Sequence, residues 1–368
     1  MKRFLFSLVI ILNISFIVTN RSAAQVYDGK EGGGKPDPQL NQKDNDYLDR
    51  QAKVFLDTVQ EILVKNRPAV PENRERGLAK LLMDAVFHEH FAAFRKPCQD
   101  FFHHQTDQLI KELEETKVEQ GAIVWKVYNM GFIVRTKSVT LAFDLARGAS
   151  SGSPDFSLSA DETDRIVKQC DVLFISHRHE DHADKAVAEN FLYNRKPVIA
   201  PEQVWKDLPI FKRITHLEWI AEKKQSLKLS PNRSLEVYIY PGHQLTSAIN
   251  NVAMVKTPDG ITIAHTGDQI NEGDFMMDWK WIDKVAANHK VDILIPNAWT
   301  TDIVRMVKGF NPALVVPGHE IELGHTVWDR LPFWGDDKYL ELNYADLKRS
   351  KYPVVVLVWG ESYHYNQQ

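Results

Sequence analysis

The stretch that decides both fold and chemistry is Ser176-His177-Arg178-His179-Glu180-Asp181-His182. An apolar run at 172–175 precedes it and predicts a buried strand that ends where the polar residues begin. Alternate side chains of a strand face opposite ways, so only a loop beyond the strand can turn neighbouring residues toward one point. Three imidazoles and the Asp181 carboxylate within a single loop are ligands for zinc, iron or manganese. An exposed polar loop is the alternative, and this density of ligand-type residues argues against it.

The stretch supplies ligands for two ions. We expect His177 and His179 to hold one metal, and Asp181 and His182 to hold a second. Each ion needs further ligands, which must come from elsewhere in the chain.

Three further residues complete the predicted ligand set: His243, Asp268 and His319. Each follows an apolar run, as the first cluster does. We expect His243 at the first ion, His319 at the second, and Asp268 bridging both. Each ion then keeps a position for water, which a catalytic site needs and a structural site lacks.

Two other histidines lie near these positions in sequence. His325, six residues after His319, is its rival as a ligand, and otherwise we expect it to contact substrate or protonate a leaving group. We expect His265, three residues before Asp268, to support the site from the core, with direct catalysis as the alternative.

The first residues predict export. Lys2 and Arg3 precede an apolar run at 4–18, and Ser22-Ala23-Ala24 supplies small residues for cleavage after Ala24. This pattern is typical of a secretory signal peptide at 1–24, and it predicts a secreted or periplasmic protein with no stable membrane span after cleavage. An uncleaved anchor is the alternative, but a span needs about 20 apolar residues.

The rest of the chain divides by composition and pattern. Residues 25–44 form a Gly- and Asp-rich flexible leader, 45–118 a helical subdomain, and 119–368 the domain that carries the ligands. Apolar residues at steps of three and four predict the helices, the second of which carries Leu78, Leu81, Leu82, Ala85 and Val86. Short apolar runs at 123–128, 132–136 and 139–143 predict strands, and 354–358 predicts the last strand. Strands mixed with helices indicate layered sheets with helices outside.

Composition narrows the classes of partner. The formal charge is −4, and cleavage after Ala24 would remove three basic residues and no acidic one, so we expect no nucleic-acid partner. The two cysteines, Cys98 and Cys170, are too few for a disulfide scaffold, and whether they pair stays open, as does the oligomeric state.

The order His177-x-His179-x-Asp181-His182, then His243, Asp268 and His319, resembles the metallo-β-lactamase superfamily of binuclear metallohydrolases over residues 119–360. The resemblance implies an α/β fold, a four-layer αβ/βα sandwich, here with an N-terminal helical extension. It implies two divalent metal ions, zinc first, with manganese or iron as alternatives. It also matches Asp144 to an early aspartate that braces the metal loops.

Individual residues distinguish between the branches of the superfamily that this chain could resemble. Flavodiiron oxidoreductases carry Glu at the position of His179, and true β-lactamases of the superfamily lack a bridging aspartate at the position of Asp268. Gly131-Phe132, Thr266-Gly267-Asp268 and Pro317-Gly318-His319 are similar to the ascorbate-6-phosphate lactonase-like and N-acyl-phosphatidylethanolamine phospholipase D-like branch.

These features predict an exported binuclear metal-dependent hydrolase. We expect it to cleave an ester, lactone or phosphodiester bond of a small-molecule or lipid-like substrate through a metal-bound hydroxide, with Asp181 orienting the water and moving its proton. A metallo-β-lactamase acting on β-lactams and a non-catalytic binding scaffold of the same fold are the alternatives.

Overall fold

A computed structural model describes residues 37–366, apart from 88, 90, 149–154, 245–247, 272, 299, 320–346 and 348–349. The predicted signal peptide lies outside the described residues. Within them, no helix combines the length and the apolar character that crossing a membrane requires.

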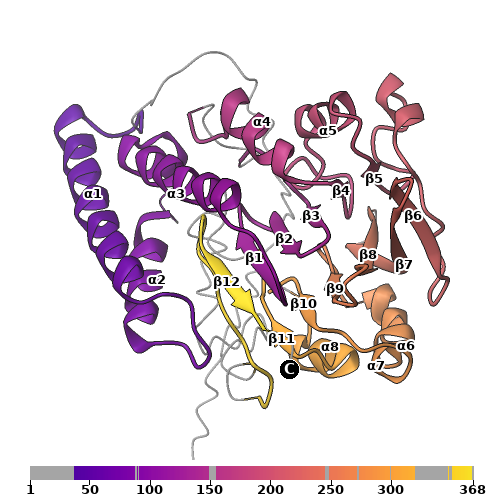
Figure 1. Cartoon of the computed structure of the whole chain (residues 1–368). Helices are drawn as coiled ribbons and strands as arrows, with labels where there is room; N and C mark the ends of the chain where they lie inside the picture. Colours follow the sequence, from indigo (N-terminus) through magenta and orange to yellow (C-terminus); the bar gives the residue numbers. More distant parts are fainter. Residues whose placement is uncertain are drawn as a thin grey trace, which may run out of the picture.

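Two six-stranded sheets form the centre of the molecule (Figure 1). The first has the order β12-β1-β2-β3-β4-β5 and the second β11-β10-β9-β8-β7-β6. The strands of the first sheet are β1 (Ala122–Lys126), β2 (Phe132–Thr136), β3 (Thr140–Phe143), β4 (Val172–Phe174), β5 (Val198–Ile199) and β12 (Ser362–Tyr365). Those of the second are β6 (Gln225–Ser230), β7 (Arg233–Gln244), β8 (Ala248–Lys256), β9 (Thr262–His265), β10 (Ile293–Ile295) and β11 (Leu314–Val315). Both sheets are mixed, because β3-β4-β5 and β9-β10-β11 run parallel while the other neighbours are antiparallel.

Side-chain alternation along the strands builds three hydrophobic clusters. In β1, Val124 faces the second sheet, whereas Ile123 and Trp125 pack against the helices on the other side. Since this strand is buried on both faces, it is apolar at nearly every position, as the run at 123–128 predicts.

Helices cover both outer faces. The first sheet is covered by α2 (Arg74–Phe87), α3 (Lys96–Glu115), α4 (Ala160–Gln169) and α5 (Lys185–Tyr193), and α1 (Gln42–Lys65) packs on the outside of α2 and α3. The second is covered by α6 (Trp279–Ile282), α7 (Val285–Asn288) and α8 (Ile303–Phe310). Short 3-10 helices occur at η1 (Ala92–Phe94), η2 (Pro209–Arg213) and η3 (Gly273–Asp278). The predicted αβ/βα sandwich with an N-terminal helical region is confirmed.

Helices α2 and α3 lie beside β1 and β12 of the first sheet (Figure 1). Phe87 of α2 and Phe102 of α3 lie 4.6 and 5.7 Å, between ring centroids, from the buried Trp359. The fully buried Arg76 of α2 donates to both carboxylate oxygens of Glu361 at 2.6 Å. Helix α2 is therefore fixed to the turn that leads into β12.

One predicted detail, the position of the last strand, is wrong. Residues 354–358 do not form the last strand: Val354 makes a single bridge to Val315, and the ladder with β1 is made by β12 instead. The segment is nevertheless buried on both sides, with Val355 and Leu357 between the sheets, so it has the apolar pattern of a strand without its pairing. On α2, Leu78 and Leu81 are exposed.

The buried face of α2 combines apolar and basic side chains: Arg76, Ala79, Lys80, Met83, Val86 and Phe87. Apolar residues lie on more than one side of this helix, so their spacing in the sequence does not show which side is buried. Cys98 and Cys170 are both buried and both free.

Candidate metal centre

The loop after β4 is held by Asp144, the residue that follows β3. Asp144 is fully buried, and its carboxylate accepts the Ser176 N–H at 2.7 Å and the Ser176 hydroxyl at 2.6 Å. Its Oδ2 also lies 2.8 Å from Nδ1 of His182. Asp144 has a left-handed backbone with φ 42°, which sharply turns the chain at the strand end. The predicted bracing aspartate thus contacts the loop at its first residue and at a ligand position.

Five of the seven predicted ligands converge. They form two groups, and within each group the ligand atoms all lie within 4.8 Å of one another. The first group is His177, His182 and Asp268, and the second is Asp181, His182 and His319. Asp268 stands between them. Its Oδ2 lies 3.5 Å from His177 Nε2 and 3.2 Å from His182 Nε2, and its Oδ1 lies 3.2 Å from His319 Nε2. This is the position that a bridging carboxylate takes.

The other two predicted ligands border this cluster without joining either group. The ring of His179 lies 4.6 Å from that of His177, between centroids, and is partly exposed. His243 lies within β7 rather than in a corner beyond it, because pairing with β8 continues through His243 to Gln244. Its Nδ1 lies 2.9 Å from Asp278 Oδ2, so Asp278 fixes the ring and leaves Nε2 as the nitrogen available to an ion.

The electrostatics of the cluster favour a cation. Burial raises the pKa of Asp268, but His182, His319 and His177 outweigh it and hold that pKa well below its usual value. Burial lowers the pKa of His177 well below its usual value, with help from His182, so this imidazole is neutral and ready to bind a metal. Burial also lowers the pKa of His182, but Asp181, Asp268 and Asp144 together raise it well above normal.

Unsatisfied atoms in the cluster provide a direct test of fit. Among the described residues, the buried Nε2 atoms of His177 and His182 and the buried Oδ1 of Asp268 accept or donate no hydrogen bond. Buried polar atoms are normally satisfied, and divalent ions bind these nitrogen and oxygen donors. The residues present therefore fit a metal centre.

His265 supports the cluster from the core. It is 2% exposed, accepts the Gly267 N–H on Nδ1 at 3.1 Å, and donates from Nε2 to the Met130 carbonyl at 2.9 Å. Its ring stacks on Phe143 at 5.1 Å between centroids. Both ring nitrogens are therefore engaged with backbone groups. His325 lies outside the described residues.

Four contacts of the cluster were not predicted from sequence. Asn129 donates to Asp181 Oδ2 at 2.6 Å, and Gln244 donates to Asp268 Oδ2 at 2.9 Å. Asp278 holds His243, and Gln269 in turn donates to Asp278 at 2.8 Å. Gln244 adjoins His243 and Gln269 adjoins Asp268 in sequence, which was the available signal. Nothing in the sequence connects Asn129 or Asp278 with a ligand, because they lie 52 and 35 positions from Asp181 and His243.

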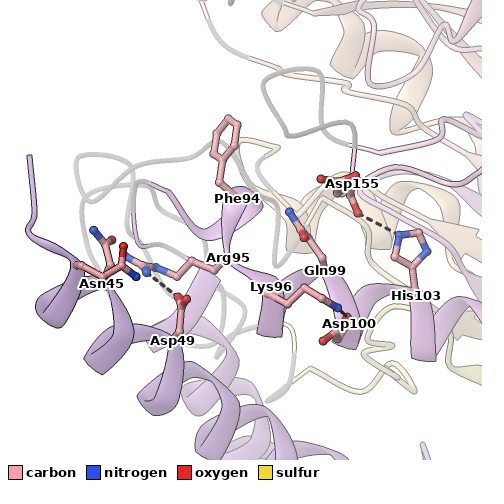
Figure 2. A pocket seen from close by; sticks show the side chains of 10 residues that line it. Asn45, Asp49, Phe94, Arg95, Lys96, Gln99, Asp100, His103 and Asp155 are labelled. Atoms are coloured by element: carbon pink, nitrogen blue, oxygen red, sulfur yellow. Dashed lines mark hydrogen bonds and ion pairs between the residues drawn. The ribbon is translucent and has the colours of Figure 1, made fainter. Parts of the chain in front are cut away.

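A separate polar cavity of about 750 Å³ lies between α1 and α3 (Figure 2). Its charged groups are paired: Arg95 with Asp49 at 2.7 Å, and His103 with the Asp155 carbonyl at 3.0 Å. No predicted ligand is among its described lining residues. Among its described lining residues, this cavity therefore brings together no group of predicted metal ligands.

The ligand positions follow the ends of β4, β9 and β11, and His243 lies near the end of β7. Two mixed sheets face each other with helices outside, and the His/Asp cluster lies where these strands end. The chain therefore forms a four-layer αβ/βα sandwich with this cluster at the ends of its strands. Searches of family models and of curated proteins found no match.

Solved structures of the metallo-β-lactamase fold and of metal-dependent hydrolases are similar to this chain. The metallo hydrolase Igni18 from Ignicoccus hospitalis is 18% identical, with a TM-score of 0.47 over 67% of this chain and 99% of its own. The isothiocyanate hydrolase from Delia radicum gut bacteria is 14% identical, with a TM-score of 0.46 over 67% and 100%. The metallo-beta-lactamase fold protein YhfI from Bacillus subtilis is 10% identical, with a TM-score of 0.42 over 67% and 99%. At these identities the similarity concerns the fold alone.

Proposed function

We propose that this protein is a metal-dependent hydrolase with a binuclear centre. The observation that carries the proposal is the convergence of His177, His182 and Asp268 with Asp181 and His319, with donor atoms of each group within 4.8 Å. His177, His179 and His243 would hold one ion, Asp181, His182 and His319 the other, and Asp268 both. Zinc suits this nitrogen-rich set best, and manganese and iron are the alternatives.

Divalent ions held there would lower the pKa of a bound water toward about 7 and polarise a scissile carbonyl or phosphoryl group. The protein supplies the orientation. Asp144 fixes the ring of His182 at its Nδ1 atom, and Asp278 fixes the ring of His243 in the same way. In both rings the opposite nitrogen, Nε2, is then the one that can bind an ion. Asp181, partly exposed at the edge of the cluster, is the carboxylate best placed to accept a proton from the attacking water.

The substrate we propose is a small or lipid-like molecule with an ester, lactone or phosphodiester bond. Asp268 supports this choice over a β-lactam, because the resemblance places a bridging aspartate on the lactonase and phosphodiesterase side. The partly exposed His179 and Asp181 leave the cluster open to a substrate. A scaffold that binds without catalysis would have no need for buried ligand atoms that lack hydrogen bonds.

The decisive experiment measures metal content together with turnover of ester, lactone, phosphodiester and β-lactam substrates. We expect close to two ions per chain, turnover of one of the first three classes, and a loss of more than about 100-fold in His182→Ala. His364→Ala is the control, because His364 is exposed on β12 and belongs to neither ligand group. A chain that binds no divalent ion, or a His182→Ala variant as active as the parent, would refute the proposal. Robust β-lactam turnover would replace the proposed substrate class.

We also propose that the protein is exported and cleaved after Ala24. The charged start, the apolar run at 4–18 and the small residues at 22–24 support this proposal. N-terminal sequencing of protein recovered outside the cytoplasm should begin at Gln25. Recovery of the full-length chain in the cytoplasm would contradict it.

A further inference from the structure

Asn129 lies in the tight turn between β1 and β2 and is fully buried. The turn is closed by the Gly131 N–H, which donates to the Tyr128 carbonyl at 2.6 Å. Asn129 has φ 50°, a left-handed conformation that asparagine tolerates better than most residues. The turn alone thus explains why a small, flexible residue stands here, but not why that residue is buried.

Asn129 contacts two predicted ligands, and the loops that carry them follow strands of different sheets. Its side-chain Nδ2 donates to Asp181 Oδ2 at 2.6 Å, in the loop that follows β4. Its backbone carbonyl accepts the His319 N–H at 3.2 Å, in the loop that follows β11. His319 is itself left-handed, with φ 70°, so this backbone contact holds a strained residue in place.

We propose that Asn129 is a positioning residue for the second ion: it fixes Asp181 and His319 relative to each other and to His182. This inference rests on the proposed function. The same Asp181 oxygen that accepts from Asn129 lies 3.1 Å from His182 Nε2, so the amide fixes the carboxylate where the two ligands meet. A hydrogen bond to a carboxylate is stronger than one between neutral groups and restricts the side chain's rotation.

Asn129 should affect the binding of the second ion and not that of the first. Asn129 contacts Asp181 and His319, which belong to the second ion, whereas the predicted ligands of the first ion are held by other groups, such as Asp278 at His243. Loss of the Asn129 side chain should therefore weaken one binding step and leave the other unchanged. A general loss of folding would weaken both.

The test is a double-mutant cycle read out by metal affinity rather than by activity. Zinc is titrated against a chromophoric chelator into the parent, Asn129→Gly, Asp181→Ala and the double variant. Glycine keeps the left-handed backbone and removes only the amide. We expect Asn129→Gly to weaken one of two binding steps by about tenfold, which is the usual effect of removing a group that supports a ligand. In the Asp181→Ala background the same change should have no further effect, because its partner is gone.

Asn311→Gly is the matched control, because Asn311 is also left-handed, with φ 44°, but caps α8 and bonds to the Tyr352 hydroxyl. It should bind both ions as the parent does. If Asn129→Gly does not fold, as judged by its thermal transition, Asn129→Asp takes its place in the cycle. Its carboxylate has no N–H to donate and repels Asp181, so it should weaken binding in the parent but not in the Asp181→Ala background. Equal losses in both backgrounds, or a parent-like isotherm for Asn129→Gly, would overturn this inference alone. A parent that binds no ion would overturn the proposed function.

Discussion

Gly267 illustrates how closely single residues are fitted at the centre. It lies directly before Asp268 with φ 52°, and an added Cβ would lie 2.3 Å from both Asn250 Oδ1 and Ser176 Cβ. Neither neighbour can withdraw easily, because Ser176 is bonded to Asp144 and Asn250 donates to the Thr266 carbonyl. Only glycine fits between strand β8 and the loop that follows β4.

Gly267→Ala should therefore destabilise the protein by about 2 kcal/mol or more, from backbone strain and overpacking together, and should also lower metal content. Urea unfolding and elemental analysis measure the two effects. Gly260→Ala is the control for strain alone, because Gly260 has φ 84° but nothing within 4 Å of its Cβ position. The explanation is wrong if the two variants lose equal stability and Gly267→Ala keeps its metal.

At the residue scale, the ligand types could be predicted because three imidazoles and a carboxylate crowd one short loop. Their supports could not. Asn129 reaches Asp181 across 52 positions, and Asp278 reaches His243 across 35. An isolated Asn or Asp gives no signal in sequence that its partner is a ligand so far away.

Between elements, a buried ion pair joins α2 to the turn before β12. Arg76 is fully buried and is bonded to both oxygens of Glu361, with Glu72 at 3.6 Å. Burial alone lowers the pKa of Arg76, but the acidic neighbours more than compensate and raise it. Without Glu361, the buried guanidinium stays charged and keeps only the longer contact with Glu72 and its bonds to two backbone carbonyls.

Glu361→Gln should destabilise the protein by about 3 kcal/mol, within the range observed when one partner of a buried ion pair is removed. Glu119→Gln, which removes the exposed partner of Lys137, should change the free energy of unfolding by less than about 0.5 kcal/mol. Denaturant titration of both variants provides the comparison. A similar small change in both would show that the Arg76 contact contributes little.

Helices α3 and α4 are joined by an ion pair that depends on pH. His103 Nδ1 lies 2.9 Å from Glu162, which also forms the capping box of α4 with Ser159. Burial lowers the pKa of His103, but the bond to Glu162 outweighs it and raises that pKa above 6.5. Burial raises the pKa of Glu162, but His103 and Ser159 outweigh it and lower that pKa below 4.5.

The raised pKa of His103 stabilises the fold below 6.5 and loses that effect as pH rises through the folded value. The lowered pKa of Glu162 stabilises the fold above 4.5 and loses that effect as pH falls through the folded value. His103→Gln should therefore lower the melting temperature more at about pH 5.5 than at about pH 8.5. Equal losses at both pH values would contradict this, and NMR titration of His103 would report its pKa directly.

An apolar run in the sequence predicts a strand correctly where the segment also pairs with neighbouring strands, and wrongly where the segment is buried without such pairing. The run at 132–136 predicts β2 at its observed bounds, because this strand is buried and paired on both sides. The run at 354–358 has the same apolar character, but it crosses between the edges of the two sheets and pairs at only one residue. Burial is visible in sequence, whereas the partner that turns a buried segment into a strand is not.

For the whole molecule, the centre joins loops of both sheets, so ion binding should stabilise the entire fold. Zinc at about 100 times its dissociation constant should add about 2.7 kcal/mol of stability, which for a chain of this size raises the melting temperature by roughly 4 °C. Thermal unfolding with zinc and with a chelator measures the shift. Asp268→Ala should lose most of it, and an unchanged melting temperature in the parent would mean that no ion binds the folded state preferentially.

The order of the centre's residues along the chain also sets a schedule for its assembly. His177 emerges from the ribosome 142 residues before His319, and β1 waits still longer for β12, its partner at the far end of the chain. At about 5–20 residues per second, synthesis leaves the first ligands without the last for roughly 7 to 28 seconds. An ion that needs ligands from both loops can therefore bind only after His319 has been synthesised, so we expect metal to bind late in the folding of this chain.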